Sequence, residues 1–199
     1  MKKMILSAVM LVFAASGRAQ EAGAASPTEH NEWLTTFEAV AVDADLDIKF
    51  VKVPDTEAPK IVYDTKGSYT SKFRAEVKDK TLRISERPDS RRPDRTEVTV
   101  YYNTLQSVSL SGAAAVFEGT VDAVQLDLTL FASTGRVAAS GLEVMSAEVN
   151  AQSKADVSLW ITDRFIGKTT TNARITYKGQ PAVVRGGAKF MGGEISHVE

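Results

Sequence analysis

The sequence predicts an all-β domain, built as a parallel β-helix-like solenoid with coils of roughly 20 residues. Apolar and polar residues alternate with a period of two along several runs, which is typical of strands with one buried face. Helical spacing is not sustained after the N-terminal segment, and Thr, Val, Ser and Asp outnumber good helix formers in these runs. A β-sandwich is the alternative, because its strands also recur with regular turns.

The repeat fills the second half of the chain. Each unit contains a β-branched marker residue, and successive markers are 21, 20 and 18 residues apart. The markers are Val116, Val137, Val157 and Ile175. Two positions before them stand the small residues Ala114, Gly135, Ala155 and Ala173. Neighbouring strands in a ladder lie about 4.8 Å apart, so bulky side chains in such a column would collide, and the pattern favours stacked coils over a sandwich.

The N-terminal segment predicts a secretory signal peptide over residues 1–20. Lys2 and Lys3 precede a mostly apolar run at 4–15, which is too short to span a bilayer. Cleavage is expected after Ala19 or Gln20. The run of small, polar and acidic residues at 21–36 is expected to be a flexible leader, and residues 37–199 a single β-solenoid domain.

The first strand is predicted over residues 40–50, where alternate positions are apolar for eleven residues. Shorter alternating runs predict further strands at 61–63, 73–77, 82–84, 98–102, 124–130 and 157–161. Proline- and glycine-containing segments separate the earlier runs and indicate turns.

Composition excludes several classes of function. Removing residues 1–20 takes away three of the 24 basic residues and no acidic one, which leaves 21 against 25 and a net charge of −4. Such a balance disfavours nucleic-acid binding. The chain has no cysteine, so it has neither disulfides nor a lipid-anchored cysteine, and a second apolar run of spanning length is absent from the sequence.

The run from Leu105 to Ala113, LQSVSLSGA, resembles the L-x-x-V-x-x-S-G-A signature of a family of exported bacterial proteins, the putative auto-transporter adhesin, head GIN domain family. The segments 37–50, 81–84 and 97–100, which contain predicted strands, are also similar to its N-terminal half. Later corners depart from the repeated Ser-Gly-Ala of the family. The resemblance covers about residues 37–199 and implies a right-handed β-solenoid outside the cytoplasm with an adhesive or envelope role. It brings no catalytic residues.

The position just before each marker holds the candidate binding residues. If the coils stack in register, Arg136, Asp156 and Arg174 form an outward column of alternating sign that begins at Ala115. The column is read either as a surface charge ladder or as a stripe that binds sugar acids, since Arg pairs with carboxylates bidentately. Trp160 is the best single candidate for stacking on a sugar ring.

Other constellations favour structural roles. Asp43, Asp45 and Asp47 lack the glycine turn and distal acidic ligand of a calcium loop, and the arginine-rich loop around Arg95 also carries acidic residues that cancel its charge. His30 and His197 lie near opposite ends of the domain. We therefore expect no catalytic residues, no metal site and no cofactor.

The predicted function is that of an exported, non-enzymatic cell-envelope or surface protein that binds a glycan or a surface protein. The final compartment is the periplasm, the outer-membrane surface or the extracellular space, and the oligomeric state is left open. The alternatives are a carbohydrate-active enzyme of the polysaccharide lyase or pectinase kind, which rests on fold analogy, and a purely structural envelope part.

Overall fold

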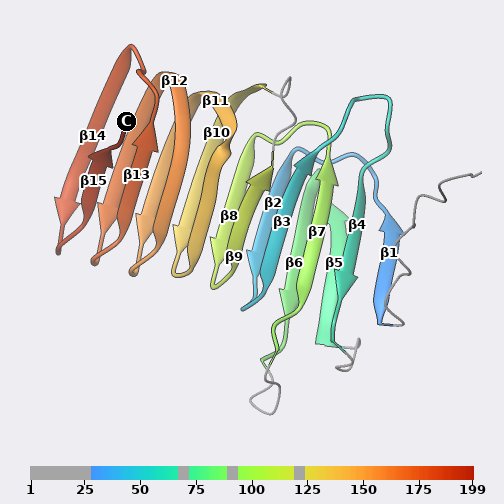
Figure 1. Cartoon of the computed structure of the whole chain (residues 1–199). Helices are drawn as coiled ribbons and strands as arrows, with labels where there is room; N and C mark the ends of the chain where they lie inside the picture. The colour runs from blue at the N-terminus through green and yellow to red at the C-terminus, as the bar shows by residue number, and fades with distance from the viewer. Residues whose placement is uncertain (1–27, 67–71, 89–93, 119–123) are drawn as a thin grey trace, which may run out of the picture.

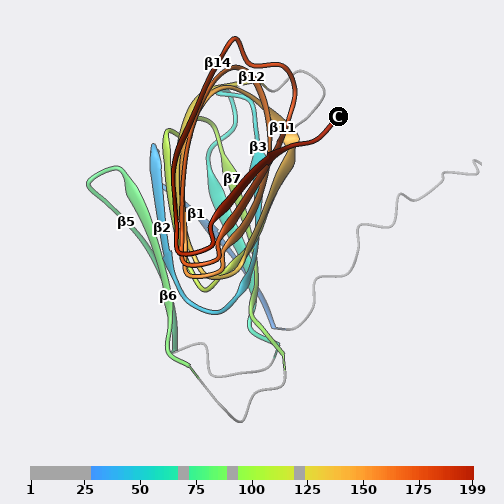
Figure 2. The same cartoon turned by 90° about the vertical axis from the view of Figure 1, so that its left-hand side faces the viewer.

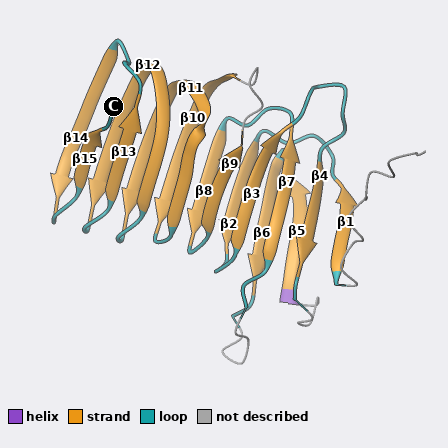
Figure 3. Cartoon of the chain, viewed as in Figure 1, coloured by secondary structure: helices purple, strands orange, loops and turns teal. Residues whose placement is uncertain are grey.

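The chain folds into β-strands joined by turns and loops (Figures 1 and 3). The computed structural model describes residues 28–66, 72–88, 94–118 and 124–199. Within these ranges there are fifteen strands and no α-helix, so the prediction of an all-β domain is confirmed. The expected signal peptide, residues 1–20, lies outside the described residues.

The strands vary in length from four to seventeen residues. In chain order they are β1 (Glu29–Trp33), β2 (Ala39–Asp43), β3 (Asp47–Lys52), β4 (Lys60–Asp64), β5 (Phe73–Lys78), β6 (Thr81–Glu86), β7 (Glu97–Tyr102), β8 (Ser107–Ser111), β9 (Ala114–Glu118), β10 (Val124–Ser133), β11 (Arg136–Gln152), β12 (Asp156–Thr170), β13 (Arg174–Lys178), β14 (Val183–Phe190) and β15 (Glu194–His197).

All these strands belong to one hydrogen-bonded sheet. Pairs in the second half of the chain are parallel, among them β10 with β11, β11 with β12, β12 with β13, and β13 with β15. The pairs β1–β4, β4–β7 and β5–β6 are antiparallel. The sheet is therefore mixed. The prediction of a parallel β-helix-like solenoid over residues 37–199 does not hold for β4 and β5, whose pairs are antiparallel, whereas β2 and β3 of the same half pair in parallel with their neighbours.

The antiparallel pairing of β5 with β6 follows from their short connection. Asp79 and Lys80, which join the two strands, have φ angles of 51° and 58°. Two successive left-handed residues give the type of tight turn that matches the twist of an antiparallel hairpin. A two-residue loop cannot carry the chain back to start a parallel strand, so this hairpin interrupts the parallel arrangement.

The sheet curls so that its two halves face each other across the core. The first part of β11 pairs with β9 and its second part with β10. In the same way, the first part of β12 pairs with β13 and its second part with β14. Viewed along the direction in which the strands stack, β11, β12 and their neighbours superpose on two sides of a flattened outline (Figure 2). We call the side formed by β3, β7, β9, β13, β15 and the first parts of β11 and β12 the first wall, and the opposite side the second wall.

The run predicted as one strand over residues 40–50 is divided between the walls. β2 pairs with β8 on the second wall, and β3 pairs with β9 on the first. Ala44 and Leu46, between them, are buried like the apolar residues of both strands. The alternation was therefore interpreted correctly as one buried face, but it continues through a bend and hides the corner.

A strand, β1, occupies part of the range expected to be a flexible leader, residues 21–36. Its partner is β4, and the Thr28 hydroxyl donates a hydrogen bond of 2.6 Å to Asp64 Oδ1. The Tyr63 hydroxyl donates to Glu32 Oε1 over 2.8 Å, and its ring stacks on His30 with centroids 5.0 Å apart. These long-range contacts hold in place a segment that has no apolar periodicity of its own.

Buried side chains from both walls form one apolar cluster. Phe50 from β3 and Phe117 from β9 are at most 1% exposed and stack with ring centroids 4.5 Å apart. Tyr102 from β7 meets Phe50 edge-on at 6.5 Å. Burying each large apolar side chain contributes about 1.5–3 kcal/mol, so the core explains how a chain without disulfides is stabilised.

Stacked corners join the two walls at one edge. Successive residues there adopt left-handed backbone conformations, namely Thr134 and Gly135, Ser153 and Lys154, and Thr171 and Asn172. Backbone hydrogen bonds connect each corner to the next, for example from Lys154 N–H to the Thr171 carbonyl at 3.0 Å and from Asn172 N–H to the Met191 carbonyl at 3.0 Å. The expected small-residue column runs through these corners.

Close packing between corners explains the glycine in that column. A Cβ atom on Gly135 would lie 2.2 Å from the carbonyl oxygen of Ala113, on the preceding corner. Ala155 and Ala173 are at most 1% exposed. The steric argument for small residues therefore applies at Gly135, Ala155 and Ala173, whereas in the first unit Ala113 rather than Ala114 is the buried member.

Among the described residues, no helix has the length and apolar character needed to cross a membrane.

Candidate functional site: a charged row on the first wall

The three charged residues predicted to form a column do lie in one row across the first wall. Arg136 on β11 is in register with Asp156 on β12, and Asp156 is in register with Arg174 on β13. The row continues to Glu194 on β15, which the sequence analysis missed. Glu194 lies 20 residues after Arg174, so the repeat spacing itself would have indicated it. We call these four residues the charge ladder.

The ladder consists of two exposed ion pairs that differ in the distance between their charged atoms. Arg174 Nε donates to Glu194 Oε2 over 3.3 Å, whereas Arg136 Nε is 4.0 Å from Asp156 Oδ2. The side chain of Arg136 is 80% exposed and that of Arg174 is 60% exposed. Exposed pairs of this kind contribute about 0–1 kcal/mol to stability. Both guanidinium groups therefore present N–H donors to solvent, and these donors suit carboxylates and other oxygen-rich ligands.

The first unit of the repeat is displaced by one position from the alignment made on sequence. Ala115, not Val116, is in register with Val137 and is buried, while Val116 pairs with Ala138 and is 45% exposed. The inward-facing Phe117 sets this alternation, because its large ring fills the core two positions after Ala115. Ala115 therefore points inward and is not a member of the charged row.

Trp160 lies on the same strand as Asp156, four residues farther along, at the other side of the first wall. It is in register with Glu143 on β11 and with Lys178 on β13. The Lys178 ammonium lies 4.5 Å from the centroid of the Trp160 ring. A cation at this distance is attracted to the ring face, so a sugar that stacks there has to displace the lysine or use the opposite face.

Short side chains occupy the row between the ladder and Trp160. Ser158 on β12, Thr176 on β13 and Ser196 on β15 are half-buried and in register. The Thr176 and Ser196 hydroxyl oxygens are 3.5 Å apart, and the Ser158 hydroxyl donates to the Val137 carbonyl over 3.4 Å. The first wall thus presents charged groups, small hydroxyls and one indole ring in parallel rows.

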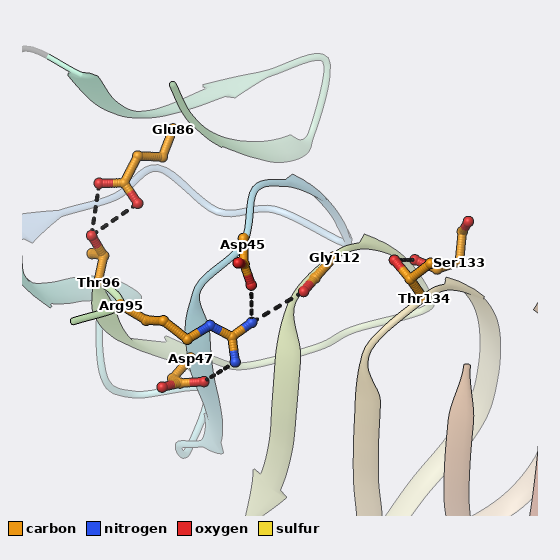
Figure 4. A network of polar contacts seen from close by, with 8 residues as sticks. All are labelled: Asp45, Asp47, Glu86, Arg95, Thr96, Gly112, Ser133 and Thr134. Atoms are coloured by element: carbon orange, nitrogen blue, oxygen red, sulfur yellow. Dashed lines mark hydrogen bonds and ion pairs between the residues drawn. The ribbon is translucent and has the colours of Figure 1, made fainter. Parts of the chain in front are cut away.

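Asp45 and Asp47, two of the three aspartates considered as a calcium site, are part of a different network (Figure 4). The Arg95 guanidinium is paired with Asp45, and its NH1 group donates to Asp47 Oδ1 over 2.8 Å. Its NH2 group also donates to the Gly112 carbonyl over 3.2 Å. This arrangement ties the corner between β2 and β3 to the start of β7 and to the corner before β9. In the described ranges, no group of three or more His, Cys, Asp or Glu residues is placed to hold a metal ion.

Arg95 is the arginine through which the arginine-rich loop takes part in this network. Residues 89–93 lie outside the described residues. Across the base of the loop, the hydroxyl of Thr96, which follows it, donates a hydrogen bond of 2.7 Å to Oε1 of Glu86, which precedes it (Figure 4). Glu86 and Arg95, one on each side of the loop, therefore have partners within the protein.

Two tyrosines of the N-terminal half have shifted acidities. Burial, and then the hydrogen bond to Glu32, raise the pKa of Tyr63 to about 12. Burial also raises the pKa of Tyr102. Both phenols are therefore neutral at physiological pH and act as packing groups, away from the charge ladder.

These observations define an all-β protein whose exposed side chains form rows across neighbouring strands. The profile of the family described as "Putative auto-transporter adhesin, head GIN domain" matches residues 36–130 and 111–181. The matches span most of the chain, and the protein belongs to this family. The resemblance noted at residues 105–113 is thereby confirmed.

The comparison with solved structures gives matches of low sequence identity. A putative adhesin from Bacteroides fragilis is 14% identical, with 85% of this chain and 96% of that chain covered and a TM-score of 0.46. A putative adhesin from Parabacteroides merdae is 14% identical, with 86% and 95% covered and a TM-score of 0.36. A putative lipid binding protein from Parabacteroides distasonis is 14% identical, with 86% and 96% covered and a TM-score of 0.35. Among curated proteins, no match was found.

Proposed function

We propose that this chain is an exported, non-enzymatic surface protein that binds a glycan or a protein partner through the first wall. Membership of the adhesin-type family supports a surface role. The signal-peptide pattern of residues 1–20 supports export to the periplasm, the outer-membrane surface or the extracellular space. The observation that carries the proposal is the charge ladder, in which two exposed arginines stand in one row.

The parallel part of the sheet is, in this proposal, a right-handed solenoid with coils of roughly 20 residues. Its support is the register, since Ala115, Val137, Val157, Ile175 and Ile195 lie opposite one another in successive strands. A solenoid gives each coil the same outline, so equivalent positions present side chains at a constant spacing of about 4.8 Å. A linear ligand that lies across the strands would meet the same kind of contact repeatedly.

The ladder and its neighbouring rows suit an acidic oligosaccharide. Arg136 and Arg174 provide guanidinium donors for carboxylates, and the hydroxyls of Ser158 and Thr176 both donate and accept hydrogen bonds. Trp160 would contact a sugar ring at the edge of the same face. Asp156 lies between the arginines and is expected to select against ligands whose negative charges are closely spaced.

Binding can be tested with an oligogalacturonate probe and its neutral methyl ester, measured by thermal shift and by calorimetry. The double variant Arg136→Ala/Arg174→Ala is expected to lose binding of the acidic probe at least tenfold. A control with the same change in charge, Arg74→Ala/Arg83→Ala on the second wall, is expected to keep it. Because the contacts are exposed charges, affinity should also fall as salt is raised.

Three outcomes would count against this function. Equal binding by the double variant and the unchanged protein would exclude the ladder as the contact surface. Accumulation of unsaturated product from the probe would indicate a lyase. A panel of acidic and neutral glycans and candidate surface proteins in which nothing raises the unfolding temperature would instead favour a structural envelope part.

A further inference from the structure

We infer that the second wall carries a separate binding site for one neutral sugar unit, in a partly open pocket that Ser146 helps to line. The pocket has a volume of about 140 Å³ and is open to solvent. It lies over β10, β11 and β12, on the side of the molecule opposite the charge ladder. Its lining residues are Asp127, Leu128, Thr129, Ser146, Ala147, Glu148, Arg164 and Ile166.

The strand register explains why the surface is hollow here. Asp127 on β10 is in register with Ser146 on β11, and Ser146 with Arg164 on β12. The short serine side chain therefore stands between a carboxylate and a long guanidinium side chain. In the next outward row, Thr129, Glu148 and Ile166 are in register and form one side of the hollow.

A break in the register places Arg164 beside the hollow. The pairing of β11 with β12 shifts between Val144 and Ser146, because two residues of β12 lie opposite one of β11 at this point. Such bulges bend the strand and re-aim the side chains next to them, and they are over-represented at sheet edges and next to active sites. The bulge is a feature of the backbone, and it lies directly before Arg164. It therefore supports the site separately from the chemistry of the lining side chains.

The mixture of groups in the pocket selects the ligand class. The carboxylates of Asp127 and Glu148 accept hydrogen bonds, the Arg164 guanidinium donates them, and the hydroxyls of Ser146 and Thr129 do both. The two carboxylates outnumber the one guanidinium of the lining, so an anion is disfavoured here, and the guanidinium disfavours a metal ion. A sugar hydroxyl donates and accepts at once, so a neutral polyhydroxy ring matches both kinds of group.

Two further contacts fit the same ligand. Ile166 is half-buried and offers an apolar surface to the C–H face of a sugar ring. Lys168 Nζ is 3.9 Å from Glu148 Oε1, and both side chains are more than half exposed, so this weak pair leaves the carboxylate able to accept hydroxyls. A carboxylate has about four acceptor positions, so Asp127 and Glu148 can accept hydrogen bonds from sugar hydroxyls while they keep contacts within the protein.

The test is an NMR titration of the isotope-labelled protein with methyl β-D-glucopyranoside and methyl β-D-galactopyranoside. A small open pocket with few polar contacts is expected to bind one of them with a Kd of about 1–10 mM. Amide shifts are expected at Ser146, Glu148 and Arg164. Arg164→Ala should weaken binding about tenfold, the effect of losing roughly one charge-assisted hydrogen bond.

A filling variant and a matched control separate the site from a general change in the protein. Ser146→Tyr fills the hollow and is expected to abolish the shifts, while Ser109→Tyr, on a half-buried serine of β8 in the same wall, should leave them unchanged. Absence of shifts with both glycosides, shifts confined to the first wall, or tighter binding of glucuronate than of the neutral sugars would each overturn the inference. None of these results depends on the charge ladder, so the Arg136→Ala/Arg174→Ala variant, tested in parallel, keeps the two proposals distinguishable.

Discussion

Replacing Gly135 by alanine is expected to destabilise the protein by about 2–5 kcal/mol. Gly135 has a φ angle of 83°, a left-handed conformation that costs roughly 1–2 kcal/mol once a Cβ atom is present. The added atom would lie 2.2 Å from the Ala113 carbonyl oxygen, so the corner must also shift. Because that oxygen belongs to the backbone, relief requires movement of the preceding corner, at a cost of about 1–3 kcal/mol.

Thermal and urea unfolding of Gly135→Ala measures this cost. For a chain of this length, each kcal/mol lowers the midpoint temperature by about 2–4 °C, so a decrease of roughly 4–20 °C is expected. Gly186→Ala is the matched control, since a Cβ on Gly186 meets no atom within 4 Å, and its effect should stay within about 0.5 kcal/mol. If both variants unfold at the same temperature as the unchanged protein, the close stacking of corners is refuted.

Further predictions concern the core, the ladder and pH. Phe50→Ala removes a ring that is 0% exposed and stacks on Phe117, and it should lower the free energy of unfolding in urea by about 3–5 kcal/mol. The control Val116→Ala changes a side chain that is 45% exposed and should lower it by less than about 1 kcal/mol. Arg174→Ala should cost less than about 1 kcal/mol, and a larger loss would contradict the description of the ladder as solvated. Because the pKa of Tyr63 is raised from its ordinary value of 10.0 to about 12, its neutral phenol contributes fully to stability below pH 10.0, and this contribution is lost as the pH rises to about 12. In urea unfolding at a series of pH values, the free energy of unfolding of Tyr63→Phe should therefore fall less with pH across this window than that of the unchanged protein.

Sequence periodicity predicted the local structure better than the topology. Apolar alternation correctly identified buried residues such as Val40, Leu46 and Phe50, because inward-facing side chains must be apolar in any arrangement of the strands. The same pattern contains no signal for a bend, since Ala44 and Leu46 stay buried while the chain crosses between walls. The strand at 29–33 was missed because tertiary contacts, and not its own pattern, hold it.

The candidate site was partly predictable for a related reason. Repeat spacing indicated the register of Arg136, Asp156 and Arg174, because parallel in-register strands convert a sequence period into a spatial row. The repeat spacing gave the wrong register in the first unit, because Val116 was chosen there as the marker for its β-branched side chain. In the structure Phe117 faces the core, so Ala115, two positions before it, is the buried residue in register with Val137. The pocket over Ser146 left no sequence signal, since it depends on a bulge and on the shortness of one side chain.

The alternating signs of the ladder have a cause that does not involve a ligand. Equivalent positions in parallel strands lie about 4.8 Å apart, so like charges there would repel and opposite charges attract. Within the ladder, each charged residue lies beside one of opposite sign, but the pairing is loose at Arg136. Its side chain is 80% exposed and 4.0 Å from Asp156. On its other side, the register of β11 with β9 places the uncharged Ala114. Arg174, in contrast, is held at 3.3 Å by Glu194. Charge compensation is therefore weakest at Arg136, and an acidic ligand of the proposed kind would gain most by contacting the ladder at that end.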